Sequence, residues 1–328
     1  MKHRRRALGA IACGLLWGAP VTRAQDRVHR IGYLSPRKTY GELDAAFVLG
    51  MQELGYVLGQ NLAIEYRWAA NDLAMLPALA EDLVRLRVEL IVTATTAGTR
   101  AAMSATRTIP IVMAAAADPV AAGLVASLGR PGGNVTGLSL QTTDLARKRL
   151  QLARELVPGA QRIGLLAEQV RDATHGTTAL LVTETRAAAA ALGITALVRE
   201  IGASDDLEDA FAWFKRERSD ALVVQVSPLT LQLAQRLVAL AARERLPALY
   251  EARNFVEAGG LASYGPDLRI SYRRAAAYVD RIFKGARAGD LPVEQPESLT
   301  LAINMRAALA LGLVLSQSLL LRADEVMR

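Results

Sequence analysis

The segment Arg30-Ile31-Gly32-Tyr33-Leu34 has a near copy, Arg162-Ile163-Gly164-Leu165-Leu166, about 130 residues further along the chain. Later features of the two halves match at a similar separation, among them the apolar runs Leu90-Ile91-Val92-Thr93 and Leu222-Val223-Val224-Gln225. Solenoid repeats have periods of roughly 20–50 residues, so this longer period indicates two domain-sized copies. Two similar lobes leave a cleft between them, and clefts between domains are preferred sites for small ligands.

The length and the first residues limit the class of protein. The chain has 328 residues, enough for two domains of roughly 100–200 residues each. Residues 1–24 are typical of an export signal, with a basic segment at 2–6, an apolar run from 7 to about 21, and the cleavage-site pattern Thr22-Arg23-Ala24. We therefore predict a periplasmic protein, and Arg5-Arg6 leaves both the general secretion route and the twin-arginine route open.

Charge and cysteine content argue against several kinds of partner. Residues 1–24 hold five of the 39 Lys and Arg residues and none of the 32 acidic residues, so the formal charge of +7 falls to +2 after cleavage. A nearly neutral chain gives no reason to expect a nucleic-acid partner, which needs clustered basic residues. The single cysteine, Cys13, leaves with the signal, so we expect neither a disulfide nor a thiolate metal site.

Segments typical of strands alternate with segments typical of helices in both halves, which predicts parallel sheets joined by right-handed crossovers. Apolar residues at helical spacing indicate a helix at 73–87, and the apolar segment 89–93 is typical of a strand covered on both faces. Further helices are expected at 118–129 and within 307–321. The expected strands are 31–34, 63–67, 89–93, 109–114, 134–140, 163–167, 195–200, 221–226, 248–250, 260–264 and 299–303.

The fold class that we expect is α/β, with two Rossmann-like lobes, parallel sheets and a hinged cleft. One lobe is predicted to contain residues 28–140 plus 254–290, and the other residues 141–253 plus 291–328. The connections between the lobes are expected near Leu140, Arg253 and Pro292. Several such connections act as a hinge that allows closure around a ligand.

Residues that directly follow the strands are candidates for the binding site, because open parallel sheets bind ligands beyond the carboxyl ends of their strands. Thr95, Thr96 and Ala97 stand at an expected helix start, where free N–H groups and the helix dipole favour an anion such as a carboxylate. Simple N-capping also explains these threonines. The candidate ligand-binding residues are Ser35, Tyr40, Thr95, Thr96, Ala97, Asp118, Ser227, Tyr250 and Tyr264.

Other candidates have a structural reading beside the functional one. Asp118 could hold an ammonium group, but Asp118-Pro119 also fits a helix N-cap followed by proline; Glu168 and Glu251 are further candidates for the ammonium. The rings of Tyr250 and Tyr264 could form walls of a pocket, or could pack in the core or the hinge.

Catalytic machinery is sparse. The export-processed chain has two histidines, His29 and His175, and neither stands in a motif with a nucleophile. The sequence contains no P-loop, no GxSxG motif and no GxGxxG after a strand, and no His/Asp/Glu spacing that resembles a metal site. We therefore predict no catalytic residue, no metal site and no cofactor.

Several motifs of the chain occur together in one family. They are Thr108-Ile109-Pro110-Ile111-Val112, the segment from Asp118 to Leu128, Arg130-Pro131-Gly132-Gly133-Asn134-Val135-Thr136-Gly137, Gly259-Gly260-Leu261-Ala262-Ser263-Tyr264-Gly265, Leu291-Pro292-Val293-Glu294-Gln295-Pro296 and Ala323-Asp324-Glu325-Val326. With these motifs the chain resembles the ABC transporter substrate-binding proteins of type I periplasmic-binding fold. Two differences are Ala117, where relatives often have Ser, and the loop 168–175, which lacks the Asn/Pro-rich composition common there.

The resemblance implies that the protein captures a small-molecule solute outside the cytoplasmic membrane and delivers it to the membrane permease of an ABC transporter. Some relatives bind aromatic or other amino acids. We therefore expect a monomer that closes around a small carboxylate-bearing ligand, an amino acid or a related organic acid.

Two other functions stay open. The first is a periplasmic sensor that presents its ligand state to a membrane receptor, and a neighbouring kinase gene rather than a permease gene would favour it. The second is an exported enzyme that uses carboxylates in the cleft, and it predicts turnover that disappears on Asp118→Asn.

Overall fold

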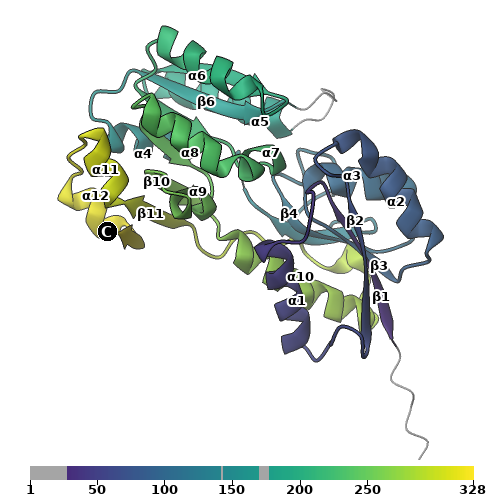
Figure 1. The fold of residues 1–328 in the computed structure, drawn as a ribbon. Helices are drawn as coiled ribbons and strands as arrows, with labels where there is room; N and C mark the ends of the chain where they lie inside the picture. Colours follow the sequence, from purple (N-terminus) through teal and green to yellow (C-terminus); the bar gives the residue numbers. More distant parts are fainter. Residues whose placement is uncertain (1–27, 142, 170–176) are drawn as a thin grey trace, which may run out of the picture.

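The computed structural model describes residues 28–141, 143–169 and 177–328, which form two α/β lobes (Figure 1). The first lobe contains a five-stranded sheet of order β2-β1-β3-β4-β5, and all its neighbouring strands are parallel. Its strands are β1 (His29–Ser35), β2 (Leu62–Trp68), β3 (Leu90–Thr93), β4 (Ile111–Ala116) and β5 (Val135–Ser139). Its helices are α1 (Glu42–Glu53), the 3-10 turn Leu73–Met75, α2 (Leu76–Arg85), α3 (Thr96–Ala105) and α10 (Leu268–Phe283).

The second lobe contains a seven-stranded sheet of order β12-β11-β10-β9-β8-β6-β7. Its neighbours are parallel except for β10 and β11. Its strands are β6 (Arg162–Glu168), β7 (Thr195–Ile201), β8 (Ala221–Val224), β9 (Ala248–Tyr250), β10 (Ala262–Gly265), β11 (Thr300–Asn304) and β12 (Glu325–Met327). Its helices are α4 (Ala146–Leu156), α5 (Thr177–Ala191), α6 (Asp206–Arg216), α7 (Pro228–Gln232), α8 (Ala234–Arg243), α9 (Arg253–Glu257), α11 (Met305–Leu311) and α12 (Gln317–Arg322).

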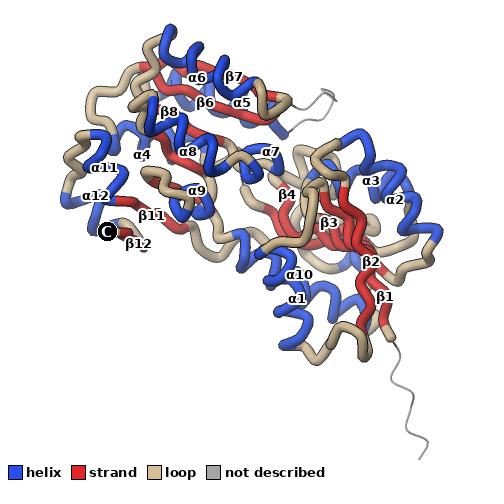
Figure 2. The backbone as a smooth tube through the Cα atoms, viewed as in Figure 1, coloured by secondary structure: helices blue, strands red, loops and turns tan. Residues whose placement is uncertain are grey.

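Helices cover both faces of each sheet, as Figure 2 shows. Successive side chains of a strand point to opposite faces, so Tyr33 packs with the core beneath α1 and α10, whereas Leu34 packs with the core beneath α2 and α3. In β8 of the second lobe, Val223 faces α4 and α5, and Val224 belongs to the core on the other face. Because both faces are buried, the inner strands β3, β4 and β8 are almost entirely apolar, whereas the edge strands β2 and β7 carry charged residues.

The repeated motif occupies the same place in both sheets. Strand β1 lies between β2 and β3, and β6 lies between β7 and β8. A Cβ atom on Gly32 would lie 3.0 Å from Leu83, and a Cβ atom on Gly164 would lie 2.7 Å from Phe214. The shared glycine therefore lets a covering side chain approach the sheet backbone closely, and the expectation of two α/β lobes with parallel sheets is confirmed.

Over the described residues the chain passes between the lobes three times, and one predicted crossing point was wrong. Strand β10 pairs with β9 and β11 of the second lobe, so residues 254–265, expected in the first lobe, lie in the second. The crossing expected near Arg253 occurs instead between β10 and α10. The reason is that β10 first pairs with β9 in the second lobe, and only then does the chain return to the first lobe.

The last crossing follows Glu294, which still belongs to the first lobe. Its N–H donates to the Gly137 carbonyl over 3.0 Å, and its own carbonyl accepts from the Ser139 N–H over 2.9 Å. Residues 291–294, expected in the second lobe, therefore extend the edge of the first sheet at β5. The first crossing joins β5 to α4, close to the predicted Leu140.

Two expected helices differ in the structure. Residues 119–123 form a turn and not a helix over 118–129, because Gly123 adopts a positive φ of 66° and ends the turn. The single C-terminal helix expected within 307–321 is two short helices, since Gly312 (φ 75°) terminates α11 and Ser316 caps α12. Within the described ranges, no helix has both the length and the apolar character needed to cross a bilayer.

Candidate functional site

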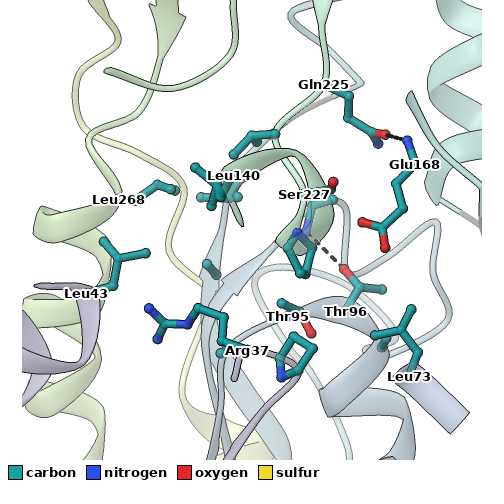
Figure 3. Close-up of a pocket in the computed structure, with 18 of the residues that line it drawn as sticks. Arg37, Leu43, Leu73, Thr95, Thr96, Leu140, Glu168, Gln225, Ser227 and Leu268 are labelled. Carbon is teal, nitrogen blue, oxygen red and sulfur yellow. Dashed lines mark hydrogen bonds between the residues drawn. The ribbon is translucent and has the colours of Figure 1, made fainter. Parts of the chain in front are cut away.

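A cavity of about 120 Å³ lies between the lobes, where the carboxyl ends of parallel strands from both sheets face each other (Figure 3). The first lobe contributes the segments that follow β1, β3 and β4, and α10 adds one wall. The second lobe contributes the ends of β6 and β8 and the start of α7. The lining residues are Pro36, Arg37, Leu43, Leu73, Ala94, Thr95, Thr96, Ala97, Ala115, Ala117, Leu140, Glu168, Thr178, Gln225, Val226, Ser227, Pro228, Leu231, Leu268 and Tyr272.

The start of α3 forms the polar part of the first-lobe wall. Thr95 caps the helix, because its Oγ1 accepts from the Gly98 N–H over 3.2 Å. The hydroxyl of Thr96 accepts from the Ala117 N–H over 3.1 Å, which joins the end of β4 to the helix start (Figure 3). The N–H groups of Thr96 and Ala97 lie in the first turn, where an α-helix supplies no partner. This wall can therefore donate hydrogen bonds to an anion.

Glu168 at the end of β6 places a carboxylate in the second-lobe wall. Figure 3 shows its side chain pointing into the cavity, while its N–H donates to Gln225 Oε1 over 3.0 Å. Burial raises the pKa of the Glu168 carboxyl above its ordinary value, and hydrogen bonds from the Ser227 hydroxyl and the Leu229 N–H oppose the shift. A partly desolvated carboxylate of this kind favours a cationic partner.

Ser227 is held by a capping box at the start of α7. Its Oγ accepts from the Thr230 N–H over 3.1 Å, and Thr230 Oγ1 accepts from the Ser227 N–H over 2.9 Å. Thr230 also donates to the Gln225 carbonyl over 2.7 Å. These contacts give the loop between β8 and α7 a defined conformation beside Glu168.

The end of the cavity away from Glu168 is mainly apolar, and Arg37 is the charged residue on that side. Figure 3 shows Leu43, Leu140 and Leu268 on that side, with the Arg37 side chain beside Leu43. The Tyr272 ring also lines the cavity, and its hydroxyl donates to the Ala94 carbonyl over 3.1 Å. The site thus has a polar end, with the first turn of α3 on one wall and the Glu168 carboxylate on the other, and a mainly apolar end closed by α10.

Four of the nine residues singled out from the sequence line the cavity, namely Thr95, Thr96, Ala97 and Ser227. The other five are absent from its wall. Ser35 is buried and accepts from the Arg37 N–H over 3.3 Å. Tyr40 is 51% exposed and contacts the edge of Tyr66.

Asp118, Tyr250 and Tyr264 serve local structure. Asp118 Oδ1 accepts from the Ala121 N–H over 3.1 Å and Oδ2 from the Thr143 hydroxyl over 2.7 Å. The Tyr250 ring stacks on Phe255 at 4.8 Å in the core of the second lobe, because α9 covers this end of β9. Tyr264 packs against a separate apolar cluster of the same lobe.

Sequence reasoning missed most of the apolar end. Leu268 and Tyr272 belong to a helix that returns to the first lobe after β10, and no local pattern connects them with Thr95. Arg37 and Gln225 each follow a strand, so the rule that pointed to Ser35 and Ser227 could have identified them. Across the part of the chain that is described, no group of three or more His, Cys, Asp or Glu residues could hold a metal ion.

Comparisons with known proteins agree with this geometry. The family model described as "ABC transporter substrate binding protein" matches residues 42–327. A tyrosine-binding protein of Clostridioides difficile (strain R20291) is 28% identical over 258 residues, which cover 79% of this chain and 73% of that protein. A solved ABC domain from Streptococcus pneumonia in complex with L-Trp is 26% identical, with a TM-score of 0.83 over 92% of this chain and 100% of that one.

The structure as a whole resembles that of the complex. A ligand-free, open substrate-binding protein of Clostridium difficile is 25% identical and covers the same 92% of this chain and 99% of its own, yet its TM-score is 0.66. The L-Trp complex, with nearly the same identity and coverage, has the higher TM-score of 0.83. Taken as a whole, the chain described here is more similar to the ligand-bound structure than to the open one.

Proposed function

This chain belongs to the ABC transporter substrate binding protein family, and from that premise we propose that it binds an aromatic amino acid between its lobes and delivers it to the permease of an ABC importer. The observation that carries the proposal is the pairing, in one cavity, of a helix start from the first lobe with a carboxylate from the second. An α-amino acid carries the two complementary charges on one carbon atom. Relatives described as tyrosine-binding and as an L-Trp complex support the ligand class.

The ligand carboxylate is assigned to the start of α3. The N–H groups of Thr96 and Ala97 and the positive end of the helix dipole favour a negative charge there, by about 0.3–1 kcal/mol for the dipole alone at an exposed site and more when buried. The Thr95 and Thr96 hydroxyls line the same wall and can add hydrogen bonds.

The ligand ammonium is assigned to Glu168. Its carboxylate faces the cavity from the second lobe, and burial already disfavours its charged form. An ammonium group replaces the lost hydration and makes a charge-assisted hydrogen bond, which is shorter and roughly twice as strong as a neutral one. The amino acid then bridges the two lobes through its two charged groups.

The ligand side chain is assigned to the apolar end. Leu43, Leu140, Leu268 and the ring of Tyr272 enclose that end. An aromatic side chain buries about 150–250 Å² when it is enclosed, so this end can contribute several kcal/mol at about 25 cal/mol per Å².

These assignments of the ligand groups to the two lobes also account for closure. The carboxylate and the aromatic ring contact the first lobe and the ammonium contacts the second, so the ligand has a higher affinity for the closed form than for the open form. The similarity of the whole chain to the L-Trp complex supports this interpretation. Export by residues 1–24, a periplasmic location and a monomeric state complete the proposal.

The test is a calorimetric titration of residues 26–328 with L-tyrosine, L-tryptophan and L-phenylalanine. Matched analogues lack the ammonium (3-phenylpropionate) or the carboxylate (tyramine). The intact amino acids should bind at least about tenfold more tightly than either analogue, because each loses a charge-assisted contact. Equal binding of the analogues, or no binding of any amino acid, would refute the assignment.

The importer role requires a separate test in cells. Deletion of the gene should lower uptake of the radiolabelled amino acid that binds, and expression of the intact chain should restore it. Unchanged uptake together with tight binding would favour the sensor function over the importer.

A further inference from the structure

A buried ion pair lies in the second lobe behind the cavity wall. Arg149 in the first turn of α4 and Glu251 directly after β9 are each 1% exposed. Arg149 Nη1 donates to Glu251 Oε1 over 2.7 Å. Neither residue lines the cavity, so the ligand contacts proposed above do not account for this pair.

Each partner also holds a piece of backbone. Glu251 Oε2 accepts from the Val226 N–H over 2.9 Å, and Val226 lies in the cavity wall beside Ser227. Arg149 Nε donates to the Tyr264 carbonyl over 3.1 Å at the end of β10. The pair therefore connects the loop that forms the second-lobe wall with the last residues of β10.

These backbone segments lead to the hinge. The chain leaves the second lobe for α10 directly after β10, and it enters the second lobe at α4, which carries Arg149. The end of β10 is also packed closely, because a Cβ atom on Gly265 would lie 2.1 Å from the Glu251 carbonyl oxygen. The buried pair thus contacts the cavity wall and the end of β10, and Arg149 belongs to α4; β10 and α4 are the elements that adjoin two of the interlobe connections.

A contribution to the stability of the fold does not by itself explain why this ion pair is buried. Burial raises the pKa of Glu251 and lowers the pKa of Arg149, so each charged form is disfavoured by its surroundings and supported by its partner. Replacing a buried ion pair with apolar residues of similar volume is often neutral or stabilising. What apolar residues cannot reproduce is the directional contact with the Val226 N–H and the Tyr264 carbonyl.

We propose that the Arg149–Glu251 pair is a positioning device. It fixes the Val226–Ser227 segment of the cavity wall relative to the hinge at the end of β10. Its role in affinity rests on the proposed function, whereas its role in coupling the wall to the hinge can be measured without a ligand. In this arrangement a movement of the β10–α10 connection during closure is transmitted to the wall through two side chains.

The first experiment measures amide hydrogen exchange of the ligand-free protein, residues 26–328. The double variant Arg149→Met/Glu251→Leu removes both charges and keeps an apolar filling. Glu208→Gln, which removes a surface ion pair with Arg236, is the matched control. We expect the double variant to melt within a few degrees of the wild type but to exchange about tenfold faster at both 224–228 and 262–268, with β6 and β7 unchanged.

Exchange that is unchanged at either segment would overturn the proposal, as would an equal increase in every segment of the second lobe. If the double variant does not fold, Glu251→Gln is measured in the same way. That variant keeps the side-chain volume but offers one acceptor oxygen where two donors converge, so it must also accelerate exchange at both segments.

The second experiment titrates the same variants with L-tyrosine and L-tryptophan. We expect the double variant to retain its melting temperature and to bind at least about tenfold more weakly, while the Glu208→Gln control binds like the wild type. A double variant with both the melting temperature and the affinity of the wild type would overturn the positioning role. If the wild type binds neither amino acid, the proposed function fails, and the exchange measurement still decides the proposal.

Discussion

Replacing Glu168 with glutamine should weaken binding of an amino acid selectively. The Glu168→Gln change keeps the side-chain volume and removes the charge that faces the cavity. A hydrogen bond to a charged group contributes about 1.5–3 kcal/mol, which corresponds to roughly 10- to 150-fold in Kd at about 1.4 kcal/mol per tenfold. We therefore expect the Kd for L-tyrosine to rise by that factor in calorimetry at pH 7.5.

A ligand without the ammonium group provides the control. The affinity for 3-(4-hydroxyphenyl)propionate should stay the same or improve in the Glu168→Gln variant, because the carboxylate no longer repels the anionic ligand. An equal loss for both ligands would show that Glu168 acts by shaping the cavity. An unchanged Kd for L-tyrosine would place the ammonium elsewhere, and either result would refute the assignment.

The same variant makes a prediction about stability and pH. Because burial raises the pKa of Glu168 in the folded protein above 4.5, the folded state holds this proton more tightly than the unfolded chain. The stability that the group contributes is complete below about pH 4.5 and is lost as the pH rises through the raised pKa. In urea unfolding without ligand, Glu168→Gln should therefore be at least as stable as the wild type at pH 7.5, and a clear loss of stability would contradict this reasoning.

Three further changes test packing in the first lobe. Gly137 has φ of 130°, and an added Cβ would lie 2.2 Å from the Met113 carbonyl oxygen, so Gly137→Ala should lower the free energy of unfolding by about 3 kcal/mol or more. The control Gly133→Ala, whose added Cβ meets no atom within 4 Å, should change the free energy of unfolding by much less. Similar urea midpoints for the two variants would contradict the predicted strain at Gly137. Tyr272→Phe removes the hydrogen bond to the Ala94 carbonyl and should cost about 1 kcal/mol in urea unfolding; no loss would mean that water replaces the bond. The buried Tyr66 hydroxyl has no hydrogen-bond partner within the described residues, so Tyr66→Phe should leave stability unchanged or raise it by up to about 1 kcal/mol, and a loss would reveal a partner.

The strands of the first sheet were accessible from the sequence because their signal is local. Continuous apolar runs such as Leu90-Ile91-Val92-Thr93 become parallel strands covered on both faces, and helical spacing between them predicts the crossovers. The repeated motif also had a local physical basis, since Gly32 and Gly164 each meet a side chain of a covering element. The polar wall at Thr95–Ala97 followed from one general rule about strand ends.

The errors arose where a residue had two local explanations. Asp118 matched a helix N-cap, and the structure shows it closing a turn and accepting from Thr143. Tyr250 also follows the strand-end rule, but its ring stacks on Phe255 of the next helix. The backbone at the end of a parallel strand faces the cleft. The direction of the last side chain, however, depends on which helix covers that end of the strand.

Local pattern was therefore sufficient for the two lobes, their parallel strands and the helix start at Thr95–Ala97 in the cavity wall, because each depends on periodicity or on the geometry of a few consecutive residues. The assembled fold was needed to place β10 in the second lobe and α10 in the first. The contact of α10 with α1 is one reason: a Cβ atom on Gly50 would lie 2.5 Å from the Arg273 carbonyl oxygen, so the glycine lets the two helices pack closely in the first lobe. Such complementarity between faces more than 200 residues apart in the chain has no local signature, and it brings Leu268 and Tyr272 to the cavity that Thr95 and Glu168 share.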